Sequence, residues 1–491
     1  MENKDVQRRS GSTRRTFLSA AGVTAVAAPI VAQSATASAA PIAGAAAARS
    51  ANPITSPSNF DPDLRALLRQ IDPNRIQAII QKLVSFGTRH TASSQTDPNR
   101  GIGAATAYVT QQLQSFAAAS NGRMTVQQQT FTQQPVPGRI PVPTQITNVI
   151  ATIKGTASPE RFYVITGHLD SRCTDVLDFT SDAPGADDDG SGVAVVLELA
   201  RVFSTLNHQF PGTLVLATVA GEEEGLFGSA HMATEMNSAG NDVQAMFSND
   251  IVGASKSFDG FPPDPFTLRL FVEGVPTNAT ANDISLLQAT GGENDSKSRQ
   301  LGRFVLDAAP FSLTNMNIRT IWRRDRYLRA SDHVSFETFG YPAARFTEPR
   351  ENFNHEHQNV RVENGVQFGD LIDFCDFDFI ARVARVNAAT LWALATAPGT
   401  PKNLQIHTAP PPNLPGTNLT TLSWNANLES NLAKYEVVKR ESTAADWTDV
   451  IDMGKATSVT LDISKDNVQF GLRAVDTAGN RSPVAFPIVV N

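Results

Sequence analysis

Three groups of polar residues in the sequence have side chains that can bind metal ions. They are Gly167-His168-Leu169-Asp170, the acidic turn Asp187-Asp188-Asp189 and the cluster Glu222-Glu223-Glu224. Carboxylates and an imidazole that converge inside a protein need a cation to offset their charge. Oxygen and nitrogen donors without a thiolate fit zinc in an open catalytic site. The sequence therefore predicts a metal centre built from these groups.

The segments around these groups predict how they are brought together. Residues 161–166 and 213–219 are apolar, β-branched runs bounded by Gly or Pro, which is typical of buried parallel strands. Between them, apolar residues recur at helical spacing from Val195 to Leu206. A strand–helix–strand unit places polar groups at the carboxyl ends of neighbouring strands, where open α/β sheets bind ligands. We therefore expect an α/β fold.

The order of these motifs resembles that of the di-zinc aminopeptidase family, which includes secreted bacterial leucyl aminopeptidases and glutamate carboxypeptidases. The resemblance covers roughly residues 75–395. It implies the zinc exopeptidase fold, with a central, mostly parallel sheet and helices on both faces. It also implies two Zn²⁺ ions per chain, with five ligands: His168, Asp188, Glu223, Asp250 and a last histidine.

Within that family pattern, Asp188 bridges the two ions and is often followed by a cis peptide bond. Asp188, Glu223 and the last histidine would hold one ion. His168, Asp250 and the shared Asp188 would hold the other. Two metals so placed would bind a water molecule between them and lower its pKa.

The resemblance gives catalytic roles to two further acids. Glu222 is the expected general base, which takes a proton as water attacks the peptide carbonyl and passes it to the leaving amine. Asp170 is expected to orient His168, because metal-bound histidines usually have a carboxylate partner. Glu224 has no assigned role, and the Ser331-Asp332-His333 motif is expected to support ligands or substrate. The other histidines, including His90, are expected to have ordinary structural surroundings.

The last histidine ligand lies in Asn354-His355-Glu356-His357-Gln358-Asn359. On an extended segment His355 and His357 would point the same way. The family usually has an Asp four positions after this ligand, and this chain has Asn359 after His355 but Arg361 after His357. A cation near zinc is unfavourable, so we predict that His355 binds metal and that His357 lines the substrate cleft.

The favoured function is that of an aminopeptidase, with peptides as substrates. A carboxypeptidase of the same family is an alternative, because the run Arg323-Arg324-Asp325-Arg326 could hold a substrate carboxylate. A glutaminyl cyclase, which keeps one zinc, is a second alternative. A binding protein that has lost its metals is a third. The complete set of ligands argues against these last two.

The amino-terminal segment predicts export. Arg14-Arg15 precedes an apolar run that is too short to span a membrane, and Ala37-Ser38-Ala39 resembles a cleavage site. These features are typical of a twin-arginine signal peptide over residues 1–39. We therefore expect a periplasmic or extracellular protein.

Changes in composition divide the rest of the chain. Residues 40–60 are rich in Ala, Pro and Ser and predict a linker, and residues 61–396 form the predicted peptidase domain. Residues 397–491 predict a small all-β sandwich that resembles a fibronectin type III domain. Nothing in this sandwich predicts catalysis, but it is a candidate for binding a surface or polymer.

The overall charge limits the expected binding partners, and the number of cysteines limits the expected disulfide bonds. A formal net charge of -7 disfavours binding to nucleic acid or to an anionic membrane. No segment after the signal is long and apolar enough to predict a membrane span. The chain has two cysteines, Cys173 and Cys375, which exclude a disulfide scaffold but leave open whether the two pair.

Overall fold

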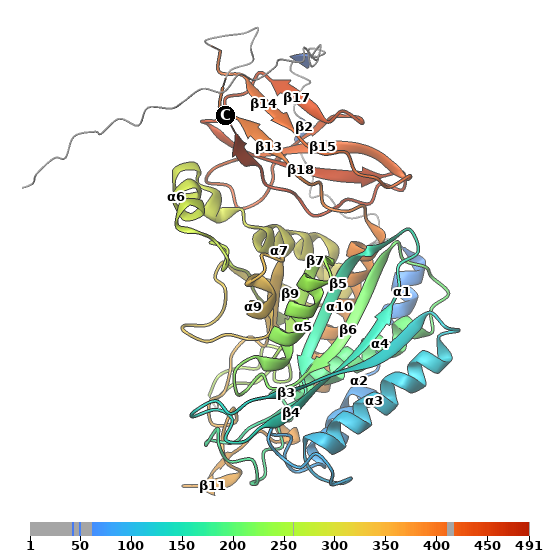
Figure 1. Ribbon diagram of the computed structural model, residues 1–491, viewed down its shortest axis with the longest axis vertical. Helices are drawn as coiled ribbons and strands as arrows, with labels where there is room; N and C mark the ends of the chain where they lie inside the picture. The colour runs from blue at the N-terminus through green and yellow to red at the C-terminus, as the bar shows by residue number, and fades with distance from the viewer. Residues whose placement is uncertain (1–41, 44–48, 51–60, 259, 410–416, 491) are drawn as a thin grey trace, which may run out of the picture. The chain divides into compact units, whose positions relative to one another are not determined.

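The structure is a computed structural model that describes residues 42–43, 49–50, 61–258, 260–409 and 417–490 (Figure 1). The predicted signal peptide lies outside the described residues. Residues 41–491 group into one compact unit.

An eight-stranded sheet forms the centre of residues 61–396 (Figure 1). Its order is β3 (Met124–Gln133), β4 (Thr144–Ile153), β6 (Gly212–Val219), β5 (Ser158–His168), β7 (Asp242–Asn249), β10 (Ala343–Thr347), β8 (Thr267–Phe271) and β9 (Asn317–Ile321). The four central neighbours β6, β5, β7 and β10 are parallel, whereas β3, β4 and β8 join them in antiparallel pairs. The predicted α/β sheet is therefore confirmed.

Helices cover both faces of this sheet because its strands are apolar on both sides. The helices of one face are α1 (Pro62–Leu68), α2 (Pro73–Val84), α3 (Ile102–Ala119), α4 (Gly190–Ser204) and α10 (Phe377–Thr396). They pack on Ile165 and Leu216, whereas the adjacent Val164 and Val215 face α5 (Phe227–Ser238) and α9 (His333–Glu337). This alternation is the two-residue period of a strand buried on both sides.

Shorter elements follow β8 and β10 along the chain. They are α6 (Ala281–Thr290), α7 (Lys297–Ala308), α8 (Phe311–Thr314), β11 (Arg361–Glu363) and β12 (Val366–Phe368). Cys173 and Cys375 are both free thiols.

The carboxy-terminal part is the predicted all-β sandwich. One sheet has the order β1 (Ile42–Ala43), β17 (Ser458–Leu461), β14 (Thr420–Ser423), β13 (Gln405–His407) and β19 (Ile488–Val490). The other has the order β18 (Val468–Asp476), β15 (Leu432–Glu441), β16 (Asp449–Asp452) and β2 (Arg49–Ser50). Trp424 and Leu422 from one sheet share a core with Tyr435 and Leu472 from the other. Two short strands of this sandwich, β1 and β2, come from the predicted linker.

A buried ion pair joins the sandwich to the segment before α7. The Asp295 carboxylate accepts hydrogen bonds from Arg303 at 3.0 Å and from Arg440 of β15 at 2.5 Å. Beside them, Trp447 Nε1 donates to Gln300 Oε1 at 3.0 Å. The contact between the sandwich and α7 is thus both charged and buried. Of the helices that the structure describes, none has the length and apolar character needed to cross a membrane.

Candidate metal centre

The polar groups predicted from the sequence meet at the carboxyl edge of the central strands. His168 is the last residue of β5, Glu223 lies in the turn after β6, and Asp250 follows β7 directly. Because β6, β5 and β7 are parallel neighbours, these three ends lie at one edge of the sheet. Asp188 lies in the loop before α4, and all four side chains are buried.

Asp188 occupies the middle of this group. Its Oδ1 atom lies 3.0 Å from His168 Nε2, and its Oδ2 atom lies 2.9 Å from His357 Nε2. A second carboxylate is close to each histidine. Asp250 Oδ1 is 3.8 Å from His168 Nε2, and Glu223 Oε2 is 3.0 Å from His357 Nε2. The side chains therefore form two groups of three that share Asp188.

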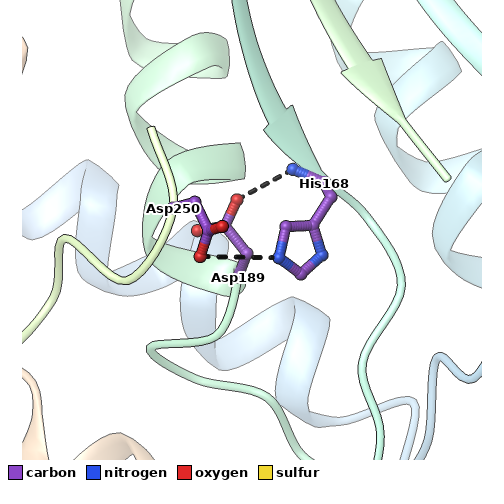
Figure 2. A group of neighbouring side chains, drawn as sticks. All are labelled: His168, Asp189 and Asp250. Carbon is purple, nitrogen blue, oxygen red and sulfur yellow. Dashed lines mark hydrogen bonds and ion pairs between the residues drawn. The ribbon is translucent and has the colours of Figure 1, made fainter. Parts of the chain in front are cut away.

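Asp189, the next residue, has a structural role. Its Oδ2 accepts a hydrogen bond from the His168 backbone N–H at 2.8 Å (Figure 2). Its Oδ1 accepts one from the Gly192 backbone N–H at 3.0 Å. Asp189 thereby caps α4 and fixes the end of β5. The peptide bond between Asp188 and Asp189 is cis, as the family resemblance implied.

Asp170 links two of the metal-binding candidates. Its backbone oxygen lies 3.1 Å from His168 Nδ1, and its Oδ1 lies 3.6 Å from the same atom. Its Oδ2 accepts a hydrogen bond from the backbone N–H of Glu223 at 3.0 Å. Burial opposes ionisation of Asp170, but His168 and the Glu223 N–H hold its pKa below its usual value. This placement suits the predicted orienting role.

Two residues absent from the sequence prediction hold the loop that carries Asp188. Asp370 accepts hydrogen bonds from the backbone N–H groups of Asp187 and Asp188, at 2.9 and 2.8 Å. The buried Arg89 guanidinium donates to the carbonyls of Leu169, Pro184 and Gly185. Neither residue has a sequence signal, because both act through contacts between distant segments.

Arg345 is a third residue that the sequence did not identify. It is buried in β10, where its Nη2 lies 3.0 Å from Asp250 Oδ1 and its Nη1 lies 3.1 Å from Asp325 Oδ1. One guanidinium thus lies between two buried carboxylates. Asp325 belongs to the run 323–326, for which carboxylate binding was an alternative in the sequence analysis.

The placement of the two candidate histidines differs from the prediction. His357 reaches Asp188 and Glu223, whereas the His355 ring stacks on Phe374 with centroids 3.5 Å apart. The prediction assumed an extended segment, but residues 353–357 form a turn, and His357 has a φ of 54°. Arg361, the cation that argued against His357, instead pairs with Glu363 at 3.0 Å.

Glu222 borders a cavity of about 450 Å³ together with Asp188, Glu223, Asp250 and His357. Burial raises the pKa of Glu222 well above its usual value, and the charges of Asp250 and Glu223 raise it further. A carboxyl group with a raised pKa beside a cavity can both accept and return a proton.

Glu224 and Asp332 are buried near the centre but do not line this cavity. Glu224 is buried, accepts a hydrogen bond from Thr91 and lies 3.1 Å from His90 Nε2, so His90 contacts the glutamate cluster. Burial raises the pKa of Asp332 to about 7. The neighbouring His333 contacts the Arg324 carbonyl at 2.9 Å.

The composition of the centre fits zinc. Burial lowers the pKa of His168 and His357, yet the surrounding carboxylates raise both well above the usual value. Glu223 Oε1 is a buried atom without a hydrogen-bond partner among the described residues, and His168 Nε2 has only carboxylate oxygens close to it. Nitrogen and oxygen donors with excess negative charge and free coordinating atoms are what a zinc ion would satisfy.

Comparison with known proteins identifies the family. Residues 148–364 match peptidase family M28. A probable zinc metalloprotease of Leptosphaeria maculans is 47% identical over 427 residues, which cover 87% of this chain and 97% of that protein. The chain belongs to peptidase family M28. A second relative of this M28 chain, a probable zinc metalloprotease of Pyricularia oryzae, is 46% identical over 433 residues, which cover 87% and 84% of the two chains.

Solved structures of similar proteins include two named enzymes. LapA aminopeptidase of Legionella pneumophila has 21% identity and a TM-score of 0.47, covering 68% of this chain and 74% of that one. Glutaminyl cyclase of Porphyromonas gingivalis has 19% identity and a TM-score of 0.42, covering 65% and 97%. The family and its fungal relatives make this M28 chain a zinc metallopeptidase.

Proposed function

We propose that this zinc metallopeptidase is a two-zinc aminopeptidase, which removes amino-terminal residues from peptides. The observation that carries the two-metal part is the geometry of Asp188. Each of its oxygens faces a different histidine, and each histidine has a second carboxylate beside it. A carboxylate shared between two such groups is suited to bridge two cations.

The ligand set follows from these distances. His168, Asp188 and Asp250 would hold one zinc ion, and His357, Asp188 and Glu223 would hold the other. His357 replaces the predicted His355 in this proposal, because His357 Nε2 lies 2.9 Å from Asp188 and 3.0 Å from Glu223, whereas the His355 ring stacks on Phe374. Asp170 would keep His168 and Glu223 in place through the contacts described above.

When bound, the zinc ions supply Lewis-acid activation of water and of the peptide carbonyl. Glu222, which lines the cavity, accepts and donates the proton. A Glu222 carboxylate oxygen accepts the proton of the attacking water and then delivers it to the nitrogen of the leaving amine. Two residues position the acidic groups of the centre. Arg345 pairs with Asp250, and Asp370 accepts a hydrogen bond from the backbone N–H of Asp188.

The direction of cleavage rests on the family resemblance. A carboxypeptidase remains the second candidate, because Arg326 and Arg329 border the same cavity as the metal-binding side chains. A glutaminyl cyclase-like enzyme would need one zinc ion per chain, whereas the two groups of candidate ligands around Asp188 support two.

Two further proposals concern the ends of the chain. Residues 1–39 would direct export by the twin-arginine route, to the periplasm or the extracellular space. The carboxy-terminal sandwich would be a fibronectin type III-like module that binds a surface or polymer. Both proposals rest on sequence features alone.

Peptides blocked at one end would test the direction of cleavage. The zinc-loaded enzyme should hydrolyse peptides with a free amino terminus and a carboxy-terminal amide, and should not hydrolyse peptides with an acetylated amino terminus. Cleavage of acetylated peptides from the carboxyl end would establish the carboxypeptidase alternative. Cyclisation of amino-terminal glutamine without peptide hydrolysis, with one zinc per chain, would establish the cyclase.

A further inference from the structure

A second cavity, of about 550 Å³, lies next to the metal centre. The two cavities share Arg326 and Arg329 in their walls. A substrate held at the metal centre could therefore extend one group past these two arginines into the second cavity. The cavity is lined by residues from β8, from the loop after β9 and from the loop after β10.

Positive charge dominates the wall of this second cavity. Five arginines line it, and Glu351 is the one acidic residue among its described lining residues. Glu351 serves three of these arginines, because its carboxylate lies 2.8 Å from nitrogen atoms of Arg269, Arg326 and Arg329. Arg326 has a further carboxylate partner, Asp325 at 3.1 Å, so the positive charge that lacks a paired carboxylate in the described part of the chain is that of the other two arginines. Arg329 also pairs with Glu356, which precedes His357 in the chain. This ion pair connects the wall of the second cavity to the metal centre.

The remaining two arginines, Arg323 and Arg350, form no ion pair with another residue that the structure describes. Arg323 uses its Nε to donate to the Asp325 carbonyl at 2.8 Å, which leaves its terminal nitrogens for other partners. Aromatic rings support both side chains. The Arg323 guanidinium lies 4.2 Å from the Tyr327 ring centroid, and that of Arg350 lies 5.1 Å from Phe261. Stacking of this kind restricts the guanidinium without using up its N–H donors.

We propose that the second cavity binds a carboxylate of the peptide substrate through Arg323 and Arg350. The inference rests on the proposed peptidase function and specifies its substrate class. A planar guanidinium presents paired N–H donors that match a carboxylate in geometry and charge. Four of the five aromatic rings that line the cavity lie against arginine guanidinium groups, so the unpaired positive charge decides the preference. The carboxylate can belong to an acidic side chain or to the carboxyl terminus of a short peptide.

Paired substrates distinguish these two sources. One arm compares peptides with Glu or Gln at each position next to the cleaved bond, and the other compares a free carboxyl terminus with its amide. For the zinc-loaded wild type, the acidic member of at least one pair should have a kcat/KM larger by about tenfold, mainly through a lower KM. The arm that shows this preference identifies the source.

The double variant Arg323→Gln/Arg350→Gln should reduce that ratio to about one, whereas the control Arg65→Gln, at an exposed site on α1, should keep the wild-type ratio. Both substrates of a pair are measured on the same preparation. A smaller folded fraction therefore lowers both kcat/KM values equally and leaves their ratio unchanged. A wild type without preference in either arm overturns the inference, as does a double variant that keeps the preference. If neutral peptides are not cleaved at all, the proposed function fails instead.

Discussion

Replacing Arg345 by Met should destabilise the metal-free protein and weaken zinc binding. Arg345 is fully buried and lies about 3 Å from one oxygen of Asp250 and one of Asp325. Met is flexible enough to fill much of the same space but carries no charge. The substitution therefore removes the cation between two buried carboxylates and leaves their packing largely in place.

The structure allows an estimate of the size of this effect. Removing one partner of a buried ion pair costs about 3–5 kcal/mol, because the other charge stays buried without compensation. Two carboxylates each lose one partner here, while Asp325 keeps Arg326 at 3.1 Å and Asp250 keeps His168 at 3.8 Å. We therefore expect a loss at the lower end of this range, about 3 kcal/mol in the free energy of unfolding. Loss of a contact that orients a metal ligand typically lowers metal affinity by about 10–100-fold, and Asp250 is such a ligand in the proposed centre.

Urea unfolding of the metal-free protein measures the first effect, and competition with a zinc chelator measures the second. The matched control is Arg361→Met, because Arg361 pairs with Glu363 at 3.0 Å while both side chains are exposed. An exposed pair contributes at most about 1 kcal/mol. If Arg345→Met loses no more stability than Arg361→Met and binds zinc normally, Arg345 does not offset the charge of these carboxylates.

Three more predictions follow from other parts of the molecule. Glu222→Gln should keep two zinc ions and lower kcat by about 10²-fold or more, because it removes the proton acceptor; a near-normal kcat in steady-state assays would contradict this. Burial and the charge of Glu273 raise the pKa of Glu337 from its usual value of 4.5 to about 10. The folded state then holds a proton that the unfolded state releases, so unfolding free energy should fall as pH rises between these values. Urea unfolding at pH 6 and 9 should show this fall in the wild type and a smaller one in Glu337→Gln, and equal falls would refute it. Deleting residues 398–491 should preserve kcat/KM for peptides but lower the melting temperature, because Asp295 loses Arg440; a soluble, zinc-loaded but inactive truncation would contradict this.

Much of the fold and the centre could be predicted because the signals are local. Segments such as 213–219 are apolar at every position, which is typical of a strand covered on both faces. A polar residue that ends such a strand, like His168, or directly follows one, like Asp250, lies at the carboxyl edge of the sheet. The spacing of strand, helix and strand then determined which of these residues come together.

Which histidine reaches Asp188 and Glu223 could not be predicted, because it depends on one turn. An extended segment would place His355 and His357 on the same side, but the turn over residues 353–357 sends His355 to Phe374 and His357 to Asp188. The roles of Arg345 and Asp370 were also beyond sequence reasoning. Each acts on a residue about a hundred or more positions away, and only the register of the packed strands and loops brings them together.

The zinc content of two single variants tests the central claim most directly. Elemental analysis should find two zinc ions per chain in the wild-type protein and in His355→Ala, but one in His357→Ala, which should also lose nearly all peptidase activity. His355→Ala is the matched control because it removes the same side chain from the same turn. One zinc per wild-type chain, or loss of zinc from His355→Ala but not from His357→Ala, would contradict the proposed two-zinc centre.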